Sequence, residues 1–374
     1  MGRSPRVFVT IACLLACACG TGGRSCRAPA GGGDASAEGA SSFRLVGRFD
    51  GTRFSWSGST VRARFLGPSL VMRLRVPAAE KSTPYTVRID DGAPFTVDAT
   101  PDRERYPLAG DLDPARPHEV TIVREAEAFA GVHELLGLDL GPGGSFLPDR
   151  PRALRIEIVG DSITCGFGVT GEPPCGFSFA TERASAAYGA RLGSALDADV
   201  TTLCWSGRGV LRNYDGTARE TMPELFELAV PTEPKARWDF GKGAPADVVV
   251  IALGTNDFQG GGGQPLDLDA FEAAYERFAR RVREVYPAAL LLLTTSPMLH
   301  HVATPSGQGL ADDLLRGRLE HVVARRTAAG DRAIELVQVP DDAPHWGCGG
   351  HPDAAMNVRI ADRLTAVIRS RLHR

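Results

Sequence analysis

A serine follows a strongly apolar run near the middle of the chain. Ile156, Ile158 and Val159 lead directly into Gly160-Asp161-Ser162. This pattern predicts a buried strand that delivers a serine to a glycine-bounded turn at its carboxyl end, where open α/β sheets bind their ligands. Taken alone, Gly-Asp-Ser indicates no more than a turn. A serine in this place becomes a nucleophile when a base and an oxyanion site lie nearby, so the rest of the chain has to supply both.

Three more short motifs follow, each near the end of a predicted strand. They are Trp205-Ser206-Gly207-Arg208-Gly209, Gly254-Thr255-Asn256-Asp257 and His351-Pro352. Together with Gly160-Asp161-Ser162, they resemble the SGNH (GDSL-type) hydrolase superfamily, in which Ser, Gly, Asn and His arrive in this order. One motif would be a weak indication, whereas four in the right order are specific.

The resemblance assigns a role to one residue of each motif. It implies that Ser162 attacks an ester carbonyl and that His351 takes the serine proton and later returns one to the departing oxygen. The backbone N–H groups of Ser162 and Gly207 and the side-chain amide of Asn256 would hold the oxyanion. Glycine permits close approach of backbone and substrate, and asparagine donates a hydrogen bond without titrating. No cofactor is implied.

The residue that should support the histidine departs from the superfamily pattern. An aspartate usually stands three residues before the histidine, and related esterases have one two residues before it; these positions are Cys348 and Gly349. The sequence therefore predicts a Ser–His dyad in which a main-chain carbonyl accepts the Nδ1 proton of His351. Asp341 and Asp342, further up the same loop, are the alternative.

Five other residues within or near the motifs are also candidates for structural or binding roles. Asp161 and Asp257 are predicted to brace their loops by accepting neighbouring N–H groups, without transferring protons. Trp205, Tyr214 and Trp346 could flank a sugar ring, and packing residues are the equal alternative.

Longer stretches of the sequence resemble one particular family within this superfamily. Residues 205–222, and a leading sandwich joined to residues 155–166, resemble carbohydrate esterase family two, and the resemblance extends from about residue 43 to the C-terminus. It implies a serine esterase that removes O-acetyl groups from acetylated carbohydrate such as xylan or glucomannan. The alternatives are a lipase or thioesterase of the same superfamily, and a non-catalytic surface carbohydrate-binding lipoprotein.

The second part of the chain predicts a flavodoxin-like three-layer α/β/α domain over residues 150–374. Apolar runs predict parallel strands at 154–159, 199–203, 247–253, 289–295 and 334–339. Residues recurring at helical spacing predict helices at 271–285, 315–323 and 356–368, between and after those strands. Alternating strands and helices are typical of this fold class.

The preceding residues, 43–145, predict an antiparallel β-sandwich of the jelly-roll type. Apolar residues alternate with polar ones in short runs, and Asp90-Asp91-Gly92 is a hairpin signal between two of them. Many short strands with one apolar face are typical of a sandwich. We expect this domain to support the catalytic domain structurally more than to bind ligands independently.

The N-terminus indicates export. Residues 1–19 combine Arg3 and Arg6 with a short apolar stretch, as in a secretory signal, and Leu14-Leu15-Ala16-Cys17 resembles a lipobox. A lipid anchor is therefore expected at Cys17, or at Cys19 in a second register, with plain secretion as the alternative. Residues 20–42 are rich in Gly, Ala and Ser and predict a disordered tether. The formal net charge is −3 and the sequence has no basic run, so nucleic acid is not an expected partner. We also expect the chain to be a monomer.

Four cysteines follow Cys26 and can form disulfides in an oxidising compartment. Of the three pairings, Cys165 with Cys175 and Cys204 with Cys348 is the preferred one, and four reduced thiols are the alternative. There is no Cys-x-x-Cys or His-x-x-x-His spacing, so no metal site is expected.

The chain has eight histidines. The adjacent pair His300 and His301 is interpreted as part of a surface loop.

Overall fold

The computed structural model describes residues 43–78, 82–342 and 346–373. The expected signal at 1–19, with its lipobox, and the tether at 20–42 lie outside the described residues. Residues Ser41–Arg374 cluster as one unit, so the domain limits at 43–145 and 150–374 stay predictions.

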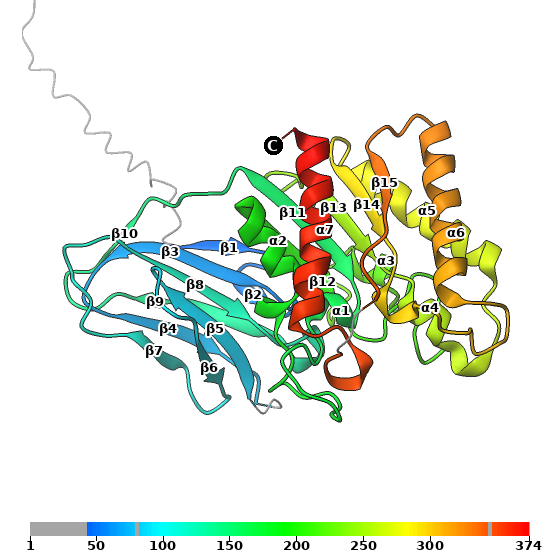
Figure 1. Cartoon of the computed structure of the whole chain (residues 1–374). Coiled ribbons are helices and arrows are strands. Elements are labelled where there is room, and N and C mark those ends of the chain that lie inside the picture. Colours follow the sequence, from blue (N-terminus) through cyan, green and yellow to red (C-terminus); the bar gives the residue numbers. More distant parts are fainter. Residues whose placement is uncertain (1–42, 79–81, 343–345, 374) are drawn as a thin grey trace, which may run out of the picture. The chain divides into compact units, whose positions relative to one another are not determined.

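The first folded region contains two antiparallel sheets, as the alternating pattern predicted (Figure 1). Its strands are β1 (Arg44–Val46), β2 (Arg53–Phe54), β3 (Thr60–Leu66), β4 (Leu70–Arg75), β5 (Thr83–Ile89), β6 (Phe95–Ala99), β7 (Arg105–Ala109), β8 (His118–Arg124), β9 (His133–Asp139) and β10 (Ser145–Leu147). One sheet has the order β1-β3-β8-β5-β6, with β10 also on β3, and the other has the order β2-β9-β4-β7. Inward-facing side chains such as Phe65 and Met72 join both sheets in one core. The jelly-roll topology remains a prediction.

The second region contains a five-stranded parallel sheet. Its strands are β11 (Leu154–Gly160), β12 (Ala198–Cys204), β13 (Val248–Ala252), β14 (Leu290–Thr294) and β15 (Ile334–Val337). Each lies where an apolar run predicted it. The order β12-β11-β13-β14-β15 is that of a flavodoxin-like sheet, in which the first strand lies between the second and the third. The carboxyl ends of β11, β12 and β13 therefore meet at one edge.

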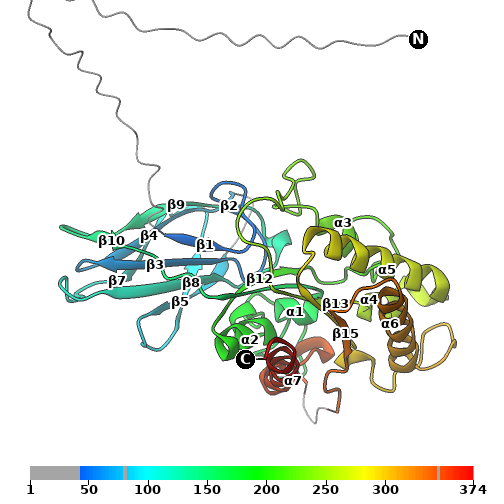
Figure 2. The ribbon, with the colours of Figure 1, turned by 90° about the horizontal axis from the view of Figure 1, so that it is seen from above.

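Helices cover both faces of this sheet (Figures 1 and 2). The α-helices are α1 (Ser162–Cys165), α2 (Tyr188–Leu196), α3 (Met222–Leu225), α4 (Thr255–Gln259), α5 (Leu268–Val285), α6 (Ala311–Ala328) and α7 (Ala354–Leu372). Short 3-10 turns are η1 (Ala128–Ala130), η2 (Ala184–Ala186), η3 (Gly261–Gly263), η4 (Pro297–Leu299) and η5 (Cys348–Gly350). Val249 and Ile251 of β13 share a core with α5 and α6, whereas Val248 and Val250 share one with α2 and α7. This alternation gives the three layers, because successive strand side chains point to opposite faces.

The two regions are joined by buried contacts. Arg48, which follows β1, is fully buried and bonds to Glu157 of β11 at 3.0 Å. Trp56, from the loop between β2 and β3, lies in the same core as α5 and α6. The sandwich is therefore packed against the strand that carries the serine. Among the described residues, no helix combines the length and apolar character that crossing a membrane requires.

Candidate active site

Ser162 is the first residue of α1, directly beyond the end of β11. Asp161 caps this short helix, because its carboxylate accepts the N–H of Ile163 at 3.0 Å. A Cβ at Gly160 would lie 1.9 Å from the Thr164 hydroxyl, so the tight turn requires glycine there. The serine is 7% exposed, and it sits at the helix N-terminus where N–H groups have no intrahelical partner.

His351 lies beside this serine although 189 residues separate them in the chain. Its Nε2 is 2.8 Å from the Ser162 hydroxyl, close enough for a hydrogen bond. Its ring stacks on Phe167, with centroids 4.0 Å apart. The loop is held by the N–H of Gly347, which donates to the His351 carbonyl at 2.7 Å. The nucleophile and the base expected from the motifs are thus brought together.

The other ring nitrogen of His351 faces the backbone. Nδ1 lies 3.2 Å from the carbonyl oxygen of Gly349. Asp341 lies instead 3.1 Å from Nδ1 of His300, and Asp342 pairs with Arg359 at 2.5 Å. Within the described part of the chain, neither aspartate reaches the imidazole, so the geometry favours the carbonyl over the carboxylate alternative.

Gly207 and Asn256 come to the same edge of the sheet. Gly207 has φ +79, a backbone conformation that favours glycine, in the loop after β12. Asn256 lies in the first turn of α4, after β13; its Nδ2 donates to the Arg208 carbonyl at 2.8 Å and lies 3.4 Å from Asp161. The amide therefore sits between the turn that carries Ser162 and the loop that carries Gly207.

Asp257 holds the loop after β12 in place. Its carboxylate accepts three consecutive backbone N–H groups, from Val210 at 2.9 Å, Leu211 at 2.8 Å and Arg212 at 3.0 Å. Burial raises the pKa of Asp257 to about 6 in spite of these donors. Asp161 accepts the N–H of Ile163, which confirms that it braces its own loop. Asp257 braces the loop at 210–212 and not its own, because the N–H groups that it accepts lie there.

A residue that the sequence analysis missed also holds this loop. Glu127, at the start of η1 in the sandwich, is fully buried, and its carboxylate accepts the N–H of Ser206 at 2.6 Å as well as the Ser206 hydroxyl. Glu182 is buried against it. Because two adjacent carboxyls cannot both ionise in a buried place, desolvation and Glu127 raise the pKa of Glu182 to about 10. No motif marks Glu127, since the loop it braces is nearly eighty residues away.

The disulfide prediction is wrong. The bonds join Cys165 with Cys204 and Cys175 with Cys348. Gly160 of β11 pairs in register with Cys204 of β12, so the turn after β11 places Cys165 next to the end of β12. The 167–183 loop in turn reaches the histidine loop, where the N–H of Gly349 donates to the Cys175 carbonyl at 2.8 Å. Strand adjacency decides the first pairing and the contact between these two loops decides the second; sequence separation reveals neither.

Aromatic rings lie between the base and the loop of Gly207. Starting at Phe167, which stacks on His351, ring centroids are 5.2 Å apart to Phe177, 5.6 Å on to Phe129 and 6.3 Å on to Trp205. Phe129 is 44% exposed and Phe177 is 39% exposed. These rings form an exposed aromatic surface beside the dyad, contributed by both regions of the chain.

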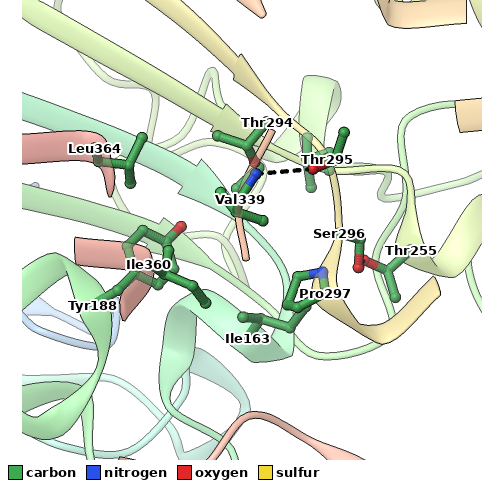
Figure 3. Close-up of a pocket in the computed structure, with 12 residues that line it drawn as sticks. Ile163, Tyr188, Thr255, Thr294, Thr295, Ser296, Pro297, Val339, Ile360 and Leu364 are labelled. Atoms are coloured by element: carbon green, nitrogen blue, oxygen red, sulfur yellow. Dashed lines mark hydrogen bonds between the residues drawn. The ribbon is translucent and has the colours of Figure 1, made fainter. Parts of the chain in front are cut away.

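A separate apolar cavity of about 20 Å³ lies behind α1 (Figure 3). Ile163, Pro297 and Ile360 are among its lining residues, and none of the four motif residues lines it. It has room for about one water molecule. This cavity is a packing gap beside the nucleophile turn and does not form the substrate site.

Known proteins resemble this chain over both regions. Residues 158–359 match the GDSL-like lipase/acylhydrolase family, and residues 45–149 match the carbohydrate esterase 2 N-terminal family. The cellulase/esterase CelE of Acetivibrio thermocellus is 32% identical over 337 residues, which are 87% of this chain and 39% of that protein. An acetylxylan esterase / glucomannan deacetylase of Cellvibrio japonicus is 32% identical over 186 residues, 49% of this chain and 51% of that protein. The chain spans less than two thirds of the length of either relative.

A solved structure resembles nearly the whole described fold. A family two carbohydrate esterase from Clostridium thermocellum, in complex with cellohexaose, has a TM-score of 0.78 and 30% identity, covering 88% of this chain and 99% of that one. The match includes the sandwich as well as the parallel sheet. Motifs, fold and comparisons agree, and the chain belongs to the GDSL-like lipase/acylhydrolase family and, within it, to the family two carbohydrate esterases.

Proposed function

We propose that this chain is an exported serine esterase that removes O-acetyl groups from a plant cell-wall polysaccharide or oligosaccharide, such as xylan or glucomannan. The observation that carries the proposal is the 2.8 Å contact between His351 Nε2 and the Ser162 hydroxyl at the edge where Gly207 and Asn256 also lie. The names of the relatives support acetylated carbohydrate as the substrate class.

The reaction uses a Ser–His dyad. Ser162 attacks the acetyl carbonyl while Nε2 of His351 takes its proton, and the resulting oxyanion accepts hydrogen bonds from the N–H groups of Ser162 and Gly207 and from Asn256. His351 then gives the proton to the sugar oxygen, which leaves as the alcohol. A water, deprotonated by His351, attacks the acetyl-serine, and acetate departs as the proton returns to Ser162. The Gly349 carbonyl orients the imidazole throughout.

The polymer is bound by the aromatic surface. The exposed rings of Phe129 and Phe177 lie next to the dyad, and flat apolar faces are suited to the C–H faces of sugar rings. Tyr214, 57% exposed in the loop after Gly207, offers another such face. Two disulfides agree with an exported chain. We further propose a lipid anchor at Cys17 or Cys19 and a monomer.

The proposal is tested by comparing hydrolysis rates on esters that differ in their acyl group and in their alcohol. We expect acetate release from acetylated xylan or glucomannan and from a small synthetic acetate, with kcat/KM falling as the acyl chain of the synthetic ester lengthens. Rates that rise with chain length would instead indicate a lipase or thioesterase. A chain that binds polysaccharide but leaves a serine-directed fluorophosphonate unreacted would be a carbohydrate-binding protein.

We expect the enzyme to remain active at mildly acidic pH. Burial lowers the pKa of His351 to about 4, so the imidazole remains neutral, and able to accept a proton, well below its ordinary value of 6.5. We expect kcat/KM for a synthetic acetate to stay level from pH 8 to about 5 and to fall below about pH 4, where His351 becomes protonated. The profile is measured while circular dichroism reports a folded chain.

An acid limb near pH 6.5 would contradict this account. Burial also raises the pKa of Asp161 to about 7, so the profile is repeated with Asp161→Asn. A limb that this substitution removes belongs to Asp161 and not to the base.

Glu127 is predicted to position the loop that carries Gly207. In Glu127→Gln the amide offers one acceptor atom where Ser206 presents both an N–H and a hydroxyl donor. Since misplacing an oxyanion donor by about 1 Å can cost roughly 100-fold in rate, we expect kcat to fall by roughly 10- to 100-fold with a smaller change in KM. Steady-state kinetics on a synthetic acetate measure this split.

Glu125→Gln is the matched control. Glu125 is an equally buried glutamate two residues away, and it accepts the N–H of Ser185 at 2.9 Å. We expect this variant to keep its kcat. Equal losses of kcat in both variants would mean that the whole contact between the sandwich and the α/β region was disturbed. That result would refute a positioning role for Glu127.

A further inference from the structure

Two histidines and two aspartates from three segments of the chain lie close together outside the site described above. His300 and His301 follow η4, Asp312 is in the first turn of α6, and Asp341 follows β15. Potential ligand atoms of His300, His301 and Asp312 all lie within 4.8 Å of one another. His301 and Asp312 are close because the loop between them is closed by a bridge between Ala303 and Leu310. Asp341 joins them only because β14 pairs with β15, which sequence spacing does not reveal.

The distances suit a shared cation. Nδ1 of His300 lies 3.1 Å from Asp341 Oδ2 and 3.8 Å from Asp312 Oδ2, and Nδ1 of His301 lies 3.8 Å from that same Asp312 oxygen. Ligand atoms held about 2.0 Å from one tetrahedral Zn²⁺ lie roughly 3.3 Å apart. These separations bracket this value, so a small inward movement would bring the ligand atoms of His300, His301 and Asp312 onto one ion. Asp341 lies beside His300, at the edge of this group.

Hydrogen bonding accounts for only part of the arrangement. Asp312 Oδ2 accepts the backbone N–H of His301 at 3.0 Å, but the imidazole of His300 is not held in this way. Nδ1 of His300 is buried and, although 3.1 Å from Asp341, has no hydrogen-bond partner among the described residues, because the oxygen lies off the direction in which an N–H would donate. The rings of His300 and His301 lie with their centroids 3.9 Å apart. Two protonated imidazoles would repel at that distance, whereas two neutral ones can both face a metal.

The charge of these side chains and the preference of imidazole ligands indicate which ion would bind. Two neutral imidazoles and two carboxylates carry a charge of −2, which a divalent cation balances. Imidazole nitrogens favour Zn²⁺ and related transition metals over Mg²⁺ or Ca²⁺, which prefer all-oxygen sites. We propose that His300, His301 and Asp312 bind one Zn²⁺-class ion, with Asp341 beside His300 as a fourth ligand once it moves inward. The ion would tie the loop after β14 and the start of α6 to the segment leading from β15 toward His351.

Metal binding to the untagged, chelator-treated full chain tests the proposal. We expect equilibrium dialysis against ZnCl₂ to give one tightly bound Zn²⁺ per chain, with a higher melting temperature, and MgCl₂ at the same concentration to give neither. The double variant His300→Ala/His301→Ala should lose the bound ion, and Asp312→Asn should bind it roughly 10- to 100-fold more weakly. Binding should also weaken toward acidic pH, because protons compete for the imidazoles.

Two controls separate this site from others. His321→Gln removes an exposed histidine of α6 that lies 3.0 Å from Glu272 of α5, and His351→Ala removes the imidazole beside Ser162. Both variants should still bind one Zn²⁺. The proposal is overturned if the parent binds no Zn²⁺, if the double variant keeps it, or if His351→Ala abolishes it. Should the double variant not fold, Asp312→Asn provides the test, because an unchanged affinity for Zn²⁺ in that variant would equally refute the site.

Discussion

We expect Ser162→Ala to abolish nearly all of the proposed acetate release, with kcat reduced by roughly four to six orders of magnitude. The substitution removes the hydroxyl that lies 2.8 Å from His351 Nε2 and leaves the other residues of the site in place. His351→Ala is expected to cost about as much, and the double variant hardly more, since the nucleophile and its base act in one proton transfer and their effects do not add. Initial rates on a synthetic acetate, over a blank without enzyme, measure the losses.

Two controls make this result specific. Asp342→Asn removes an aspartate of the histidine loop that pairs with Arg359, and we expect it to keep near-parental activity. Labelling with a fluorophosphonate should occur in the parent and in Asp342→Asn and should be absent in Ser162→Ala. Substantial turnover by a folded Ser162→Ala chain would end the esterase proposal.

Asn256→Ala has the second largest expected effect, a loss of roughly 100- to 1000-fold in kcat with KM little changed. The amide of Asn256 already donates at 2.8 Å to the Arg208 carbonyl, while its contact with Asp161 is long, at 3.4 Å. The hydrogen in the longer contact is the one free to turn toward an oxyanion. Because that charge exists in the transition state and not in the bound ester, the loss should fall on kcat.

Gln259→Ala tests whether the effect belongs to the oxyanion. Gln259 lies on the same helix, and its amide donates to the Met298 carbonyl at 2.9 Å, so truncation there removes an amide without touching the reaction. We expect this variant to keep its kcat. A rise in KM with kcat intact in Asn256→Ala would instead assign the side chain to ground-state binding.

Much of the site was predictable because three of the four motifs directly follow buried strands. The apolar runs that precede Ser162, Ser206 and Asn256 predict β11, β12 and β13 with small errors at their ends, and parallel strands bring their carboxyl ends to one edge. His351 was found through the order of the motifs and not through its own surroundings. Periodicity also separated the antiparallel sandwich from the α/β domain.

Contacts between distant loops were not predictable in the same way. The pairing of Cys165 with Cys204 depends on β11 lying next to β12, and the bracing of Ser206 by Glu127 depends on how the sandwich packs against that edge. Neither follows from residue spacing, because strand order and packing are decided by which apolar faces are buried together. Buried polar groups such as Glu127 also interrupt the apolar pattern without indicating their partner.

The amino-acid sequence by itself determined the kinds of element, their succession and the chemistry available at each strand end, since these depend on local periodicity and side-chain type. Tertiary structure alone decided that the Gly349 carbonyl, and not Asp341 or Asp342, faces the His351 imidazole, and that Asp341 instead joins His300. The physical reason is that these contacts join loops whose positions are set by the pairing and burial of the whole sheet, which no short stretch of the chain encodes.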